Sequence, residues 1–252
     1  MPELAIILPT LDEAENLAPL VEALEGLGED LHLFVVDDNS RDGTQEIATG
    51  LSVTFGNLTV ISRPARLGLG SALRTGVSAA LDTNARFVMT MDADLSHDPA
   101  DVPRLLEVIR AGEADMVQGS RYVSGGGVQH WGIGRWLLSR LANLLYHWGT
   151  GAPHESTTNF RVLSRSAAAL VAARSKSNGY GFMPEVTLLV MAAGMKVLEV
   201  PITFTGRKRG QSKMGTRQMI NGLGSLLSNV LQYRLRLGRY SRRLYRDNPV
   251  IE

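Results

Sequence analysis

Residues 86–99 read RFVMTMDADLSHDP, a short apolar run followed by two aspartates one residue apart. Side chains two residues apart in a strand point the same way, so Asp92 and Asp94 can reach one cation from the end of a buried strand. Carboxylate oxygens suit Mg²⁺ or Mn²⁺, and protein sites often share these ions with substrate phosphates. The stretch therefore predicts a divalent metal that holds a diphosphate. We interpret His97 as a loop residue or a supporting partner, not as a metal ligand.

The alternation of apolar run and polar turn recurs along the first half of the chain. Apolar runs predict strands at 4–8, 31–36, 58–61, 86–91 and 115–119, and the segments between them predict helices at 14–27, 43–51, 68–82 and 99–111. Runs that are apolar throughout and separated by helices indicate parallel strands covered on both faces. The predicted fold class is α/β, with a mostly parallel sheet and flanking helices.

Polar side chains follow each predicted strand and so gather at one edge of the sheet. Ligands of open α/β sheets bind beyond the carboxyl ends of the strands, which makes this edge the predicted site. Adjacent Asp37 and Asp38 repel each other, so a cation or several hydrogen-bond donors should lie nearby. The polar residues concerned are Pro9, Thr10, Asp12, Glu13, Asp37, Asp38, Asn39, Arg63, Arg66, Asp92, Asp94, Ser120 and Arg121.

Composition excludes several classes of site. The chain has 252 residues, 44% of them hydrophobic and 20% charged, as in an ordinary soluble protein with a sizeable core. Without cysteine it has no disulfide, thiolate zinc site or cysteine nucleophile. A net charge of +1 gives no general attraction to nucleic acid. The N-terminal residues do not resemble a signal peptide, and the longest uncharged run near the C-terminus, 218–233, is too short and polar for a transmembrane span.

Known phosphate-binding and hydrolase motifs are missing. No P-loop and no Gly-x-Ser-x-Gly elbow occurs, and RLGLGSALRTG (66–76) lacks the third glycine of a dinucleotide-binding fingerprint. We expect its glycines to permit close approach of a helix start to a strand or a ligand.

Segment 125–151 predicts an amphipathic helix after three glycines. Leu137, Leu141, Leu144, Leu145 and Trp148 share one face. A second face carries residues four apart: Arg135, Ser139 and Asn143. One interpretation is an ordinary surface helix of the core. The other is a helix that lies on a bilayer or lipid tail and presents its polar face to an anion.

The last 35 residues combine an apolar helix face with a basic end. The apolar residues are Leu223, Leu226, Leu227, Val230 and Leu231, and six arginines follow among three tyrosines. Such a tail suits an anionic membrane surface. The alternative is a helix packed on its own domain or on a sister subunit, with a solvated basic end.

Nine motifs in order resemble one family, the dolichol-phosphate or polyprenol-phosphate mannosyltransferases of the inverting glycosyltransferase family 2. They are ILPTLDEAENL (7–17), VVDDNSRDGT (35–44), RPARLGLGSAL (63–73), MDADLSHDP (91–99), GSRYVSGG (119–126), WGIGRWLLSRLAN (131–143), NFRVLSR (159–165), GYGFMPE (179–185) and EVPITFTGRKRGQSKM (199–214). The resemblance implies a GT-A fold, with a Rossmann-like sheet and a C-terminal amphipathic helix. It implies a catalytic domain at 1–217 and a basic helical tail at 218–252.

The resemblance also implies residue roles. It assigns the nucleotide base and ribose to Pro9, Glu13, Val36 and Asp38, and the metal and diphosphate to Asp92, Ala93, Asp94 and Ser96. Arg121, Arg135 and Ser139 match residues that grip a lipid phosphate, and Arg207 and Lys213 match basic residues of a loop that closes over the donor. The implied catalytic set is Asp92, Asp94 and Arg121, with Mg²⁺ or Mn²⁺ as cofactor.

The implied reaction transfers a hexose, foremost mannose from GDP-mannose, to polyprenyl or dolichyl phosphate. The implied setting is the cytoplasmic face of a membrane, which the basic tail or a separate anchoring subunit would contact. The sequence differs from the family at Leu11, Asp12, Ser96, Glu155 and Asn159, and the last of these points to the acceptor side. UDP-glucose or another donor, a non-lipid acceptor, and a binding protein without turnover remain alternatives.

Overall fold

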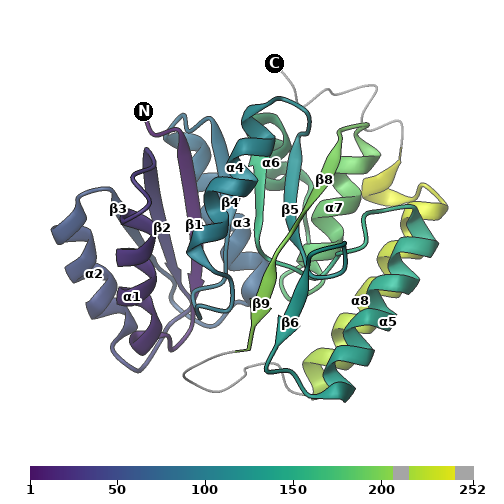
Figure 1. Cartoon of the computed structure of the whole chain (residues 1–252), viewed down its shortest axis with the longest axis horizontal. Helices are drawn as coiled ribbons and strands as arrows, with labels where there is room; N and C mark the ends of the chain where they lie inside the picture. The colour runs from purple at the N-terminus through teal and green to yellow at the C-terminus, as the bar shows by residue number, and fades with distance from the viewer. Residues whose placement is uncertain (207–215, 242–252) are drawn as a thin grey trace.

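A single mixed sheet forms the centre of the protein (Figure 1). The computed structural model describes residues 1–206 and 216–241, the side chains of 216–223 excepted. Within those residues, seven strands pair in the order β3-β2-β1-β4-β7-β5-β8, and β6 pairs with β9 in a separate ribbon. The sheet strands are β1 (Leu4–Thr10), β2 (Leu31–Asp37), β3 (Leu58–Ser62), β4 (Phe87–Thr90), β5 (Met116–Ser120), β7 (Arg161–Ser164) and β8 (Val197–Pro201). The ribbon strands are β6 (Gly127–Gln129) and β9 (Thr203–Thr205).

Helices cover both faces of the sheet, as the uniformly apolar strands require. One core cluster joins the sheet to α1 (Ala14–Glu25), α2 (Thr44–Phe55) and α4 (Val102–Arg110). The opposite cluster joins it to α3 (Leu69–Asp82), α6 (Arg165–Arg174) and α7 (Phe182–Ala192). Figure 1 shows these as the layers in front of and behind the sheet. The α/β class predicted from the apolar runs is therefore confirmed.

The five predicted strands all form, with ends that differ by one or two residues from the expected ranges. Strand β7 was not predicted, although it lies in the middle of the sheet between β4 and β5. It runs antiparallel to both neighbours. Arg161 of β7 lies opposite Thr90 of β4 on one side and opposite Gln118 of β5 on the other. Its four residues RVLS are too few to form an apolar run that sequence periodicity detects.

Hydrogen-bond donors from the protein itself resolve the repulsion between the adjacent aspartates. Asp37 accepts from Thr10 Oγ1 at 3.0 Å and from the main-chain N–H of Ser40 at 3.0 Å. Asp38 accepts from the N–H groups of Leu67 and Gly68 and pairs with Arg63 Nη1 at 2.9 Å. The expected donors and cation are thus protein groups, and they fix the end of β2.

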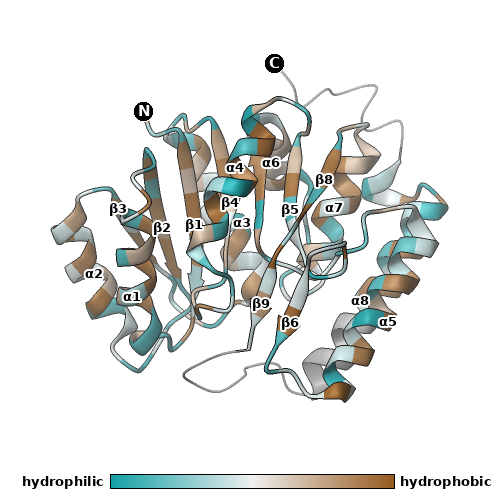
Figure 2. Cartoon of the chain, viewed as in Figure 1, coloured by the Kyte–Doolittle hydropathy of each residue, from teal (hydrophilic) through white to brown (hydrophobic). Residues whose placement is uncertain are grey.

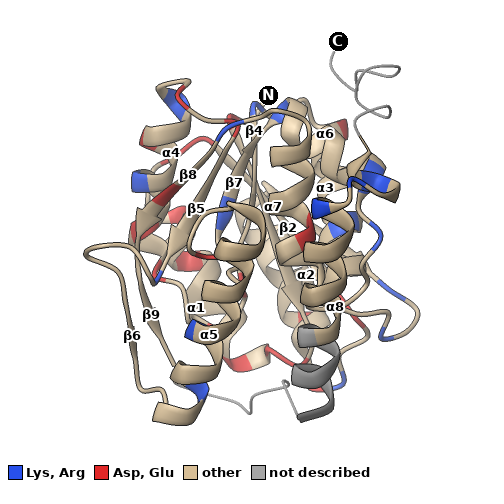
Figure 3. Ribbon diagram, turned by 90° about the vertical axis from the view of Figure 1, so that its right-hand side faces the viewer, with Lys and Arg blue, Asp and Glu red and all other residues tan. Residues whose placement is uncertain are grey.

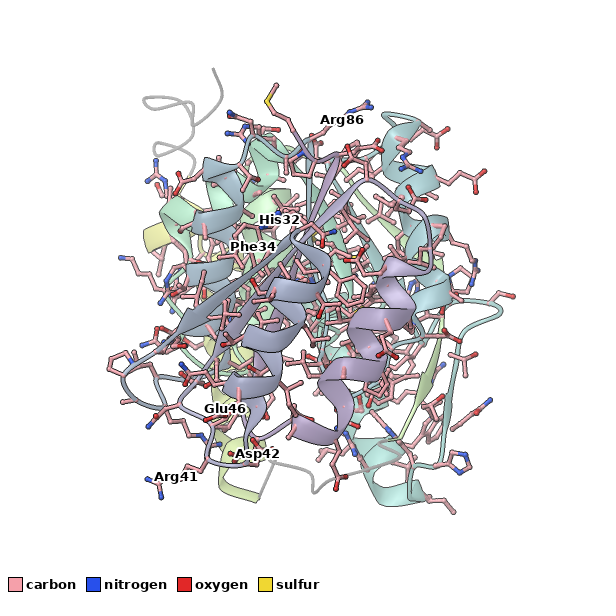
Figure 4. The ribbon with its side chains drawn as sticks, turned by 90° about the vertical axis from the view of Figure 1, so that its left-hand side faces the viewer. His32, Phe34, Arg41, Asp42, Glu46 and Arg86 are labelled. Atoms are coloured by element: carbon pink, nitrogen blue, oxygen red, sulfur yellow. The ribbon has the colours of Figure 1, made fainter. Side chains whose placement is uncertain are left out.

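The turn at 40–44 fastens the start of α1 as well as that of α2. Asp42 accepts from the N–H of Ala14 at 3.0 Å and from that of Thr44 at 3.1 Å. The hydroxyl of Thr44 accepts from Glu13 N at 2.8 Å. Figure 4 labels Asp42 below the first turn of α2. Burial opposes ionisation of Asp42, but these hydrogen bonds hold the pKa of its carboxyl below the ordinary value.

The glycines at the start of α3 permit a close approach, and the partner is the loop between α6 and α7, not the expected strand or ligand. A Cβ on Gly70 would lie 2.7 Å from Phe182 Cβ and 2.9 Å from the carbonyl oxygen of Gly179. Ser71 N donates to the carbonyl of Asn178 at 3.2 Å. The α6–α7 loop is therefore held against the N-terminal end of α3.

Helix α5 (Ile133–Thr150) exposes most of its large apolar residues, while its polar face is exposed at Arg135 and buried at Asn143. Asn143 is buried, and its Oδ1 accepts from the N–H of Ser156 at 2.6 Å. The exposed large residues of α5 are Ile133, Trp136, Leu137, Leu138, Leu141, Leu144, Leu145 and Trp148. Figure 2 shows brown, hydrophobic bands along α5. The five apolar residues named from the sequence are exposed, whereas Tyr146 and Ala142 of the same helix pack against α7 and α8.

Helix α8 (Thr216–Arg234) lies beside α5 and packs on its own domain, which agrees with one of the two expectations for this segment. Leu226 is buried against Leu188 and Leu189 of α7, whereas Leu227 and Leu231 remain exposed. Charged residues are sparse on the outer sides of α5 and α8 (Figure 3). No helix among the described residues is long and apolar enough to cross a membrane. Leu223 and the arginines of the tail at 242–246 lie outside the described side chains.

Candidate active site

One cavity of about 840 Å³ opens at the carboxyl ends of β1, β2 and β4 and extends to α5, α7 and α8. The predicted residues that line it are Pro9, Thr10, Glu13, Asp38, Arg66, Asp92, Ala93, Asp94, Ser96, Arg121, Arg135 and Ser139. Val36 is not among them, because its side chain is buried in the core against α3. Arg207 and Lys213 lie outside the described residues. The structure therefore brings together most of the site expected from the sequence.

The acidic pair lies directly after β4. Asp94 is buried and accepts from the N–H of Ser96 at 3.0 Å. Asp92 is partly exposed, and its Oδ1 accepts from Asn159 Nδ2 at 2.9 Å. The buried hydroxyl of Ser96 has no hydrogen-bond partner among the described residues. These oxygen donors fit a hard cation such as Mg²⁺ or Mn²⁺.

The acidic pair does not form a complete metal cage. No group of three or more His, Asp or Glu side chains in the described part of the chain is arranged to hold a metal. Two carboxylates and a hydroxyl leave coordination positions for phosphate oxygens and water, as is usual for Mg²⁺ bound with a nucleotide.

His97 lies near the acidic pair. It is buried, stacks on Phe160 with ring centroids 5.0 Å apart, and meets the edge of Phe204 at 5.1 Å. Its Nδ1 lies 3.9 Å from Asp92 Oδ2. Burial lowers the pKa of His97 to about 4, against the opposing charge of Asp94, so the ring is neutral at pH 7. Neither ring nitrogen has a hydrogen-bond partner among the described residues, so the supporting role of His97 stays a prediction.

Arg121 and Glu155 form a buried ion pair on the opposite wall of the cavity. Arg121 Nε lies 2.7 Å from Glu155 Oε2, and its Nη2 lies 2.7 Å from Oε1 and 2.7 Å from Thr157 Oγ1. The guanidinium also lies over the rings of Trp131 and Phe204, at 5.2 and 5.3 Å. Burial opposes the charge of Arg121, but Glu155 holds its pKa above the ordinary value. Arg121 therefore stays a cation at the cavity wall.

Helix α5 supplies the second group of polar residues. The Arg135 guanidinium lies 4.1 Å from the centre of the Trp131 ring, at cation–π distance. The hydroxyl of Tyr122 donates to Ser139 Oγ at 2.7 Å. Arg135, Ser139 and Arg121 thus face the same space, as the sequence predicted.

An apolar wall completes the cavity on the side of the helices. Its residues come from α5, α7 and α8: Leu138, Ala142, Met183, Pro184 and Leu226. The cavity therefore combines an acidic wall at the strand ends, three arginines (Arg66, Arg121 and Arg135) and an apolar region.

Sequence reasoning missed the aromatic residues of the site. Trp131 and Phe204 flank Arg121 and His97, and Tyr180 lines the cavity from the α6–α7 loop. Trp131 and Phe204 meet because β6 and β9 pair, with Val128 opposite Phe204. Three-residue strands leave no periodic signal, so a short motif around each aromatic residue was the only trace in the sequence.

Comparison with protein families and curated proteins gives two consistent results. The family model for glycosyl transferase family 2 matches residues 5–170. The chain is 37% identical over 212 residues to a polyprenol monophosphomannose synthase from Mycolicibacterium smegmatis, covering 83% of this chain and 80% of that protein. It is 35% identical over 212 residues to an undecaprenyl-phosphate mannosyltransferase from Micrococcus luteus, covering 82% and 86%.

Solved structures share the fold. A glucosyl-3-phosphoglycerate synthase from Mycobacterium tuberculosis, solved with phosphoglyceric acid, gives a TM-score of 0.70 at 20% identity over 91% of this chain and 80% of that one. A mannosyltransferase from Pyrobaculum calidifontis, solved with GDP-Man and Mn²⁺, gives 0.63 at 16% identity over 94% and 65%. At these identities the likeness establishes the architecture, and the GT-A expectation is confirmed.

Proposed function

The chain belongs to glycosyl transferase family 2, and from that premise we propose that it transfers mannose from GDP-mannose to a polyprenyl phosphate. The observation that carries the proposal is a single cavity lined both by the Asp92–Asp94 pair and by Arg135 and Ser139 of α5. The names of the two curated relatives, which cover more than four fifths of the chain, support mannose and a polyprenyl phosphate.

The strand ends supply the donor site. Pro9, Glu13 and Asp38 line the cavity where a nucleoside would lie, and Asp38 is held rigid by Arg63 and two N–H groups. Asp92, Asp94 and Ser96, with Ala93 between them, would hold Mg²⁺ or Mn²⁺. A divalent cation bound there neutralises charge that develops on the departing diphosphate. In this proposal Arg207 and Lys213 add positive charge over the donor.

The helices supply the acceptor site. Arginine binds phosphate through parallel hydrogen bonds, so Arg135 and Ser139 are suited to the phosphate monoester. Arg121 already donates through Nε and Nη2 to Glu155 and Thr157. We therefore assign the hydrogen bonds to the acceptor phosphate to Arg135, while Arg121 adds a fixed positive charge to the cavity wall. Leu138, Met183 and Leu226 offer the adjoining lipid an apolar surface.

The reaction is a single displacement. An oxygen of the acceptor phosphate forms a bond to the anomeric carbon, while the bond from that carbon to the diphosphate oxygen breaks and its electron pair leaves with the nucleoside diphosphate. The configuration at the anomeric carbon inverts. The acceptor is already an anion at neutral pH, so this chain needs to orient it and exclude water, without a general base.

The outer side of α5 and α8 is proposed to rest on a membrane. The two helices expose leucines and tryptophans and also carry Arg135, Arg140 and Arg234. Such a surface suits the boundary of a bilayer that carries anionic lipid, where a polyprenyl phosphate resides.

The test uses purified full-length protein with Mn²⁺, a short polyprenyl phosphate, and either GDP-mannose or UDP-glucose, with the product identified by mass. We expect mannosyl phosphate lipid from GDP-mannose and no product from the Asp92→Ala variant. Asp82→Ala, an exposed change at the far end of α3, is the matched control and should keep full activity. Product from UDP-glucose alone, or full activity of Asp92→Ala, would refute the proposal.

A further inference from the structure

Asn159 lies opposite Asp92 because of the antiparallel strand that the sequence did not reveal. In the β4–β7 pair, Phe87 is opposite Ser164 and Thr90 is opposite Arg161. The same register continued past the strand ends sets Asp92 against Asn159. The hydrogen bond from Asn159 Nδ2 to Asp92 Oδ1, at 2.9 Å, spans that position.

The main chain around Asn159 is firmly held. The hydroxyl of Thr90 donates to the carbonyl of Asn159 at 2.7 Å, and both residues are buried. The N–H of Phe160 donates to Thr158 Oγ1 at 3.1 Å, and Arg161 Nη2 donates to the carbonyl of Thr158. Since Thr90 ends the strand that also presents Asp92, the amide and the carboxylate are fixed to one rigid element.

The amide of Asn159 donates to Oδ1 of Asp92, and Oδ2 lies 3.9 Å from His97 Nδ1. A carboxylate that rotates freely must lose that freedom when it binds a cation, whereas one already held by a donor does not. Groups that hydrogen-bond to a metal ligand orient it in this way and strengthen metal binding. Asn159 is 2% exposed and lines the cavity, so its amide is within the site and is not part of the solvated surface.

We propose that Asn159 is a positioning residue that presets the Asp92 carboxylate for the divalent cation and the donor diphosphate. The proposal rests on the proposed function. It assigns Asn159 to the donor side, whereas the sequence had pointed to the acceptor side. It also explains why the residue beside Asp92 has an amide: the amide donates a hydrogen bond without adding a third negative charge to the pair.

The experiment measures Mn²⁺ binding directly, by the loss of the free Mn²⁺ paramagnetic resonance signal in the presence of GDP. For Asn159→Ala we expect the Mn²⁺ dissociation constant to rise about tenfold, the scale reported for groups that orient metal ligands. Transfer activity should recover when Mn²⁺ is raised in proportion, and the Michaelis constant for the lipid acceptor should stay unchanged.

Asn57→Ala is the matched control, because Asn57 also makes side-chain hydrogen bonds, to Glu25 and to the carbonyl of Leu31, away from the cavity. It should lower stability without changing the Mn²⁺ constant. If Asn159→Ala binds Mn²⁺ as wild type does, the positioning role is wrong and the proposed function stands. If the wild-type protein neither binds Mn²⁺ with GDP nor transfers mannose, the proposed function itself fails.

Discussion

Arg121 and Glu155 meet through two hydrogen bonds of 2.7 Å in the interior of the protein. Arg121 follows β5, and Glu155 lies in the segment that leads into β7, so the pair joins two neighbouring parts of the sheet edge. The Glu155 carboxylate also accepts from the N–H and hydroxyl of Thr157, at 3.0 and 2.9 Å. The positive wall of the cavity therefore depends on a carboxylate that the cavity does not expose.

The first prediction concerns the stability of this pair. Glu155→Gln keeps the shape of the side chain but leaves the Arg121 charge buried without its partner. We expect the free energy of unfolding to fall by about 3–5 kcal/mol, the range for breaking a buried ion pair from one side. Urea unfolding followed by circular dichroism measures it. Glu22→Gln, an exposed change on α1, should have no effect; an equal loss there would contradict the interpretation.

The second prediction is the pH dependence that follows. Burial raises the pKa of Glu155, but Arg121 and Thr157 outweigh it and hold the pKa below the ordinary 4.5. A carboxyl whose pKa is lower in the folded protein contributes stability above its unfolded pKa and loses it as the pH falls through the folded value. The stability difference between wild type and Glu155→Gln should therefore be full at pH 6 and shrink below about pH 4.5. A difference independent of pH would contradict the assignment.

The parallel half of the sheet was predictable because each strand there is an apolar run followed by a polar turn. The position of β7 was not, since the pairing of Arg161 with Thr90 and Gln118 is set by contacts between distant segments. The Asn159–Asp92 hydrogen bond depends on that pairing, so it could not be predicted from the sequence either. The acids at 92 and 94 were predictable because strand periodicity alone brings them to one side.

Helix α5 shows a second limit of sequence reasoning. Periodicity correctly separated the leucine face from the face of Arg135, Ser139 and Asn143. It could not say which face turns inward, because hydropathy favours burial of the leucines. In the structure Asn143 is buried and bonds to Ser156, Ser139 is half-buried and bonds to Tyr122, and Arg135 is exposed where it lines the cavity.

The third prediction tests the acceptor site on α5. Arg135→Ala removes the proposed grip on the phosphate, and a hydrogen bond to a charged group contributes about 1.5–3 kcal/mol. The Michaelis constant for polyprenyl phosphate should therefore rise roughly 10- to 100-fold, with the constant for GDP-mannose unchanged. Arg140→Ala on the same helix is the control, since Arg140 does not line the cavity. Equal effects of both changes would indicate general attraction to the lipid surface.

The fourth prediction tests the outer face of α5. Leu141, Leu144 and Trp148 are 54%, 45% and 74% exposed, so replacing all three with serine should leave folding intact. A buried apolar side chain of this size contributes roughly 1.5–3 kcal/mol, so binding to vesicles with anionic lipid should fall at least about tenfold. Co-sedimentation measures it. Val53→Ser, exposed on α2, is the control. If the triple variant sediments like wild type, a separate membrane subunit becomes the better explanation.

The fifth prediction concerns the close contact between α3 and the α6–α7 loop. Alanine at Gly70 would press its Cβ against Phe182 Cβ and the carbonyl of Gly179, and main chain cannot yield as a flexible side chain can. We expect Gly70→Ala to lower the free energy of unfolding by about 1–3 kcal/mol. It should also reduce transfer, because the displaced loop carries Gly179 and Tyr180 of the cavity wall.

Gly50, in α2, has nothing within 4 Å of its added Cβ. Gly50→Ala should therefore raise stability by about 0.5–1 kcal/mol, since alanine favours the helix. Urea unfolding gives the free energy of unfolding of both variants, and the difference between them isolates the effect of the close contact at Gly70. A Gly70→Ala variant more stable than wild type would show that the loop moves without cost and would contradict the prediction.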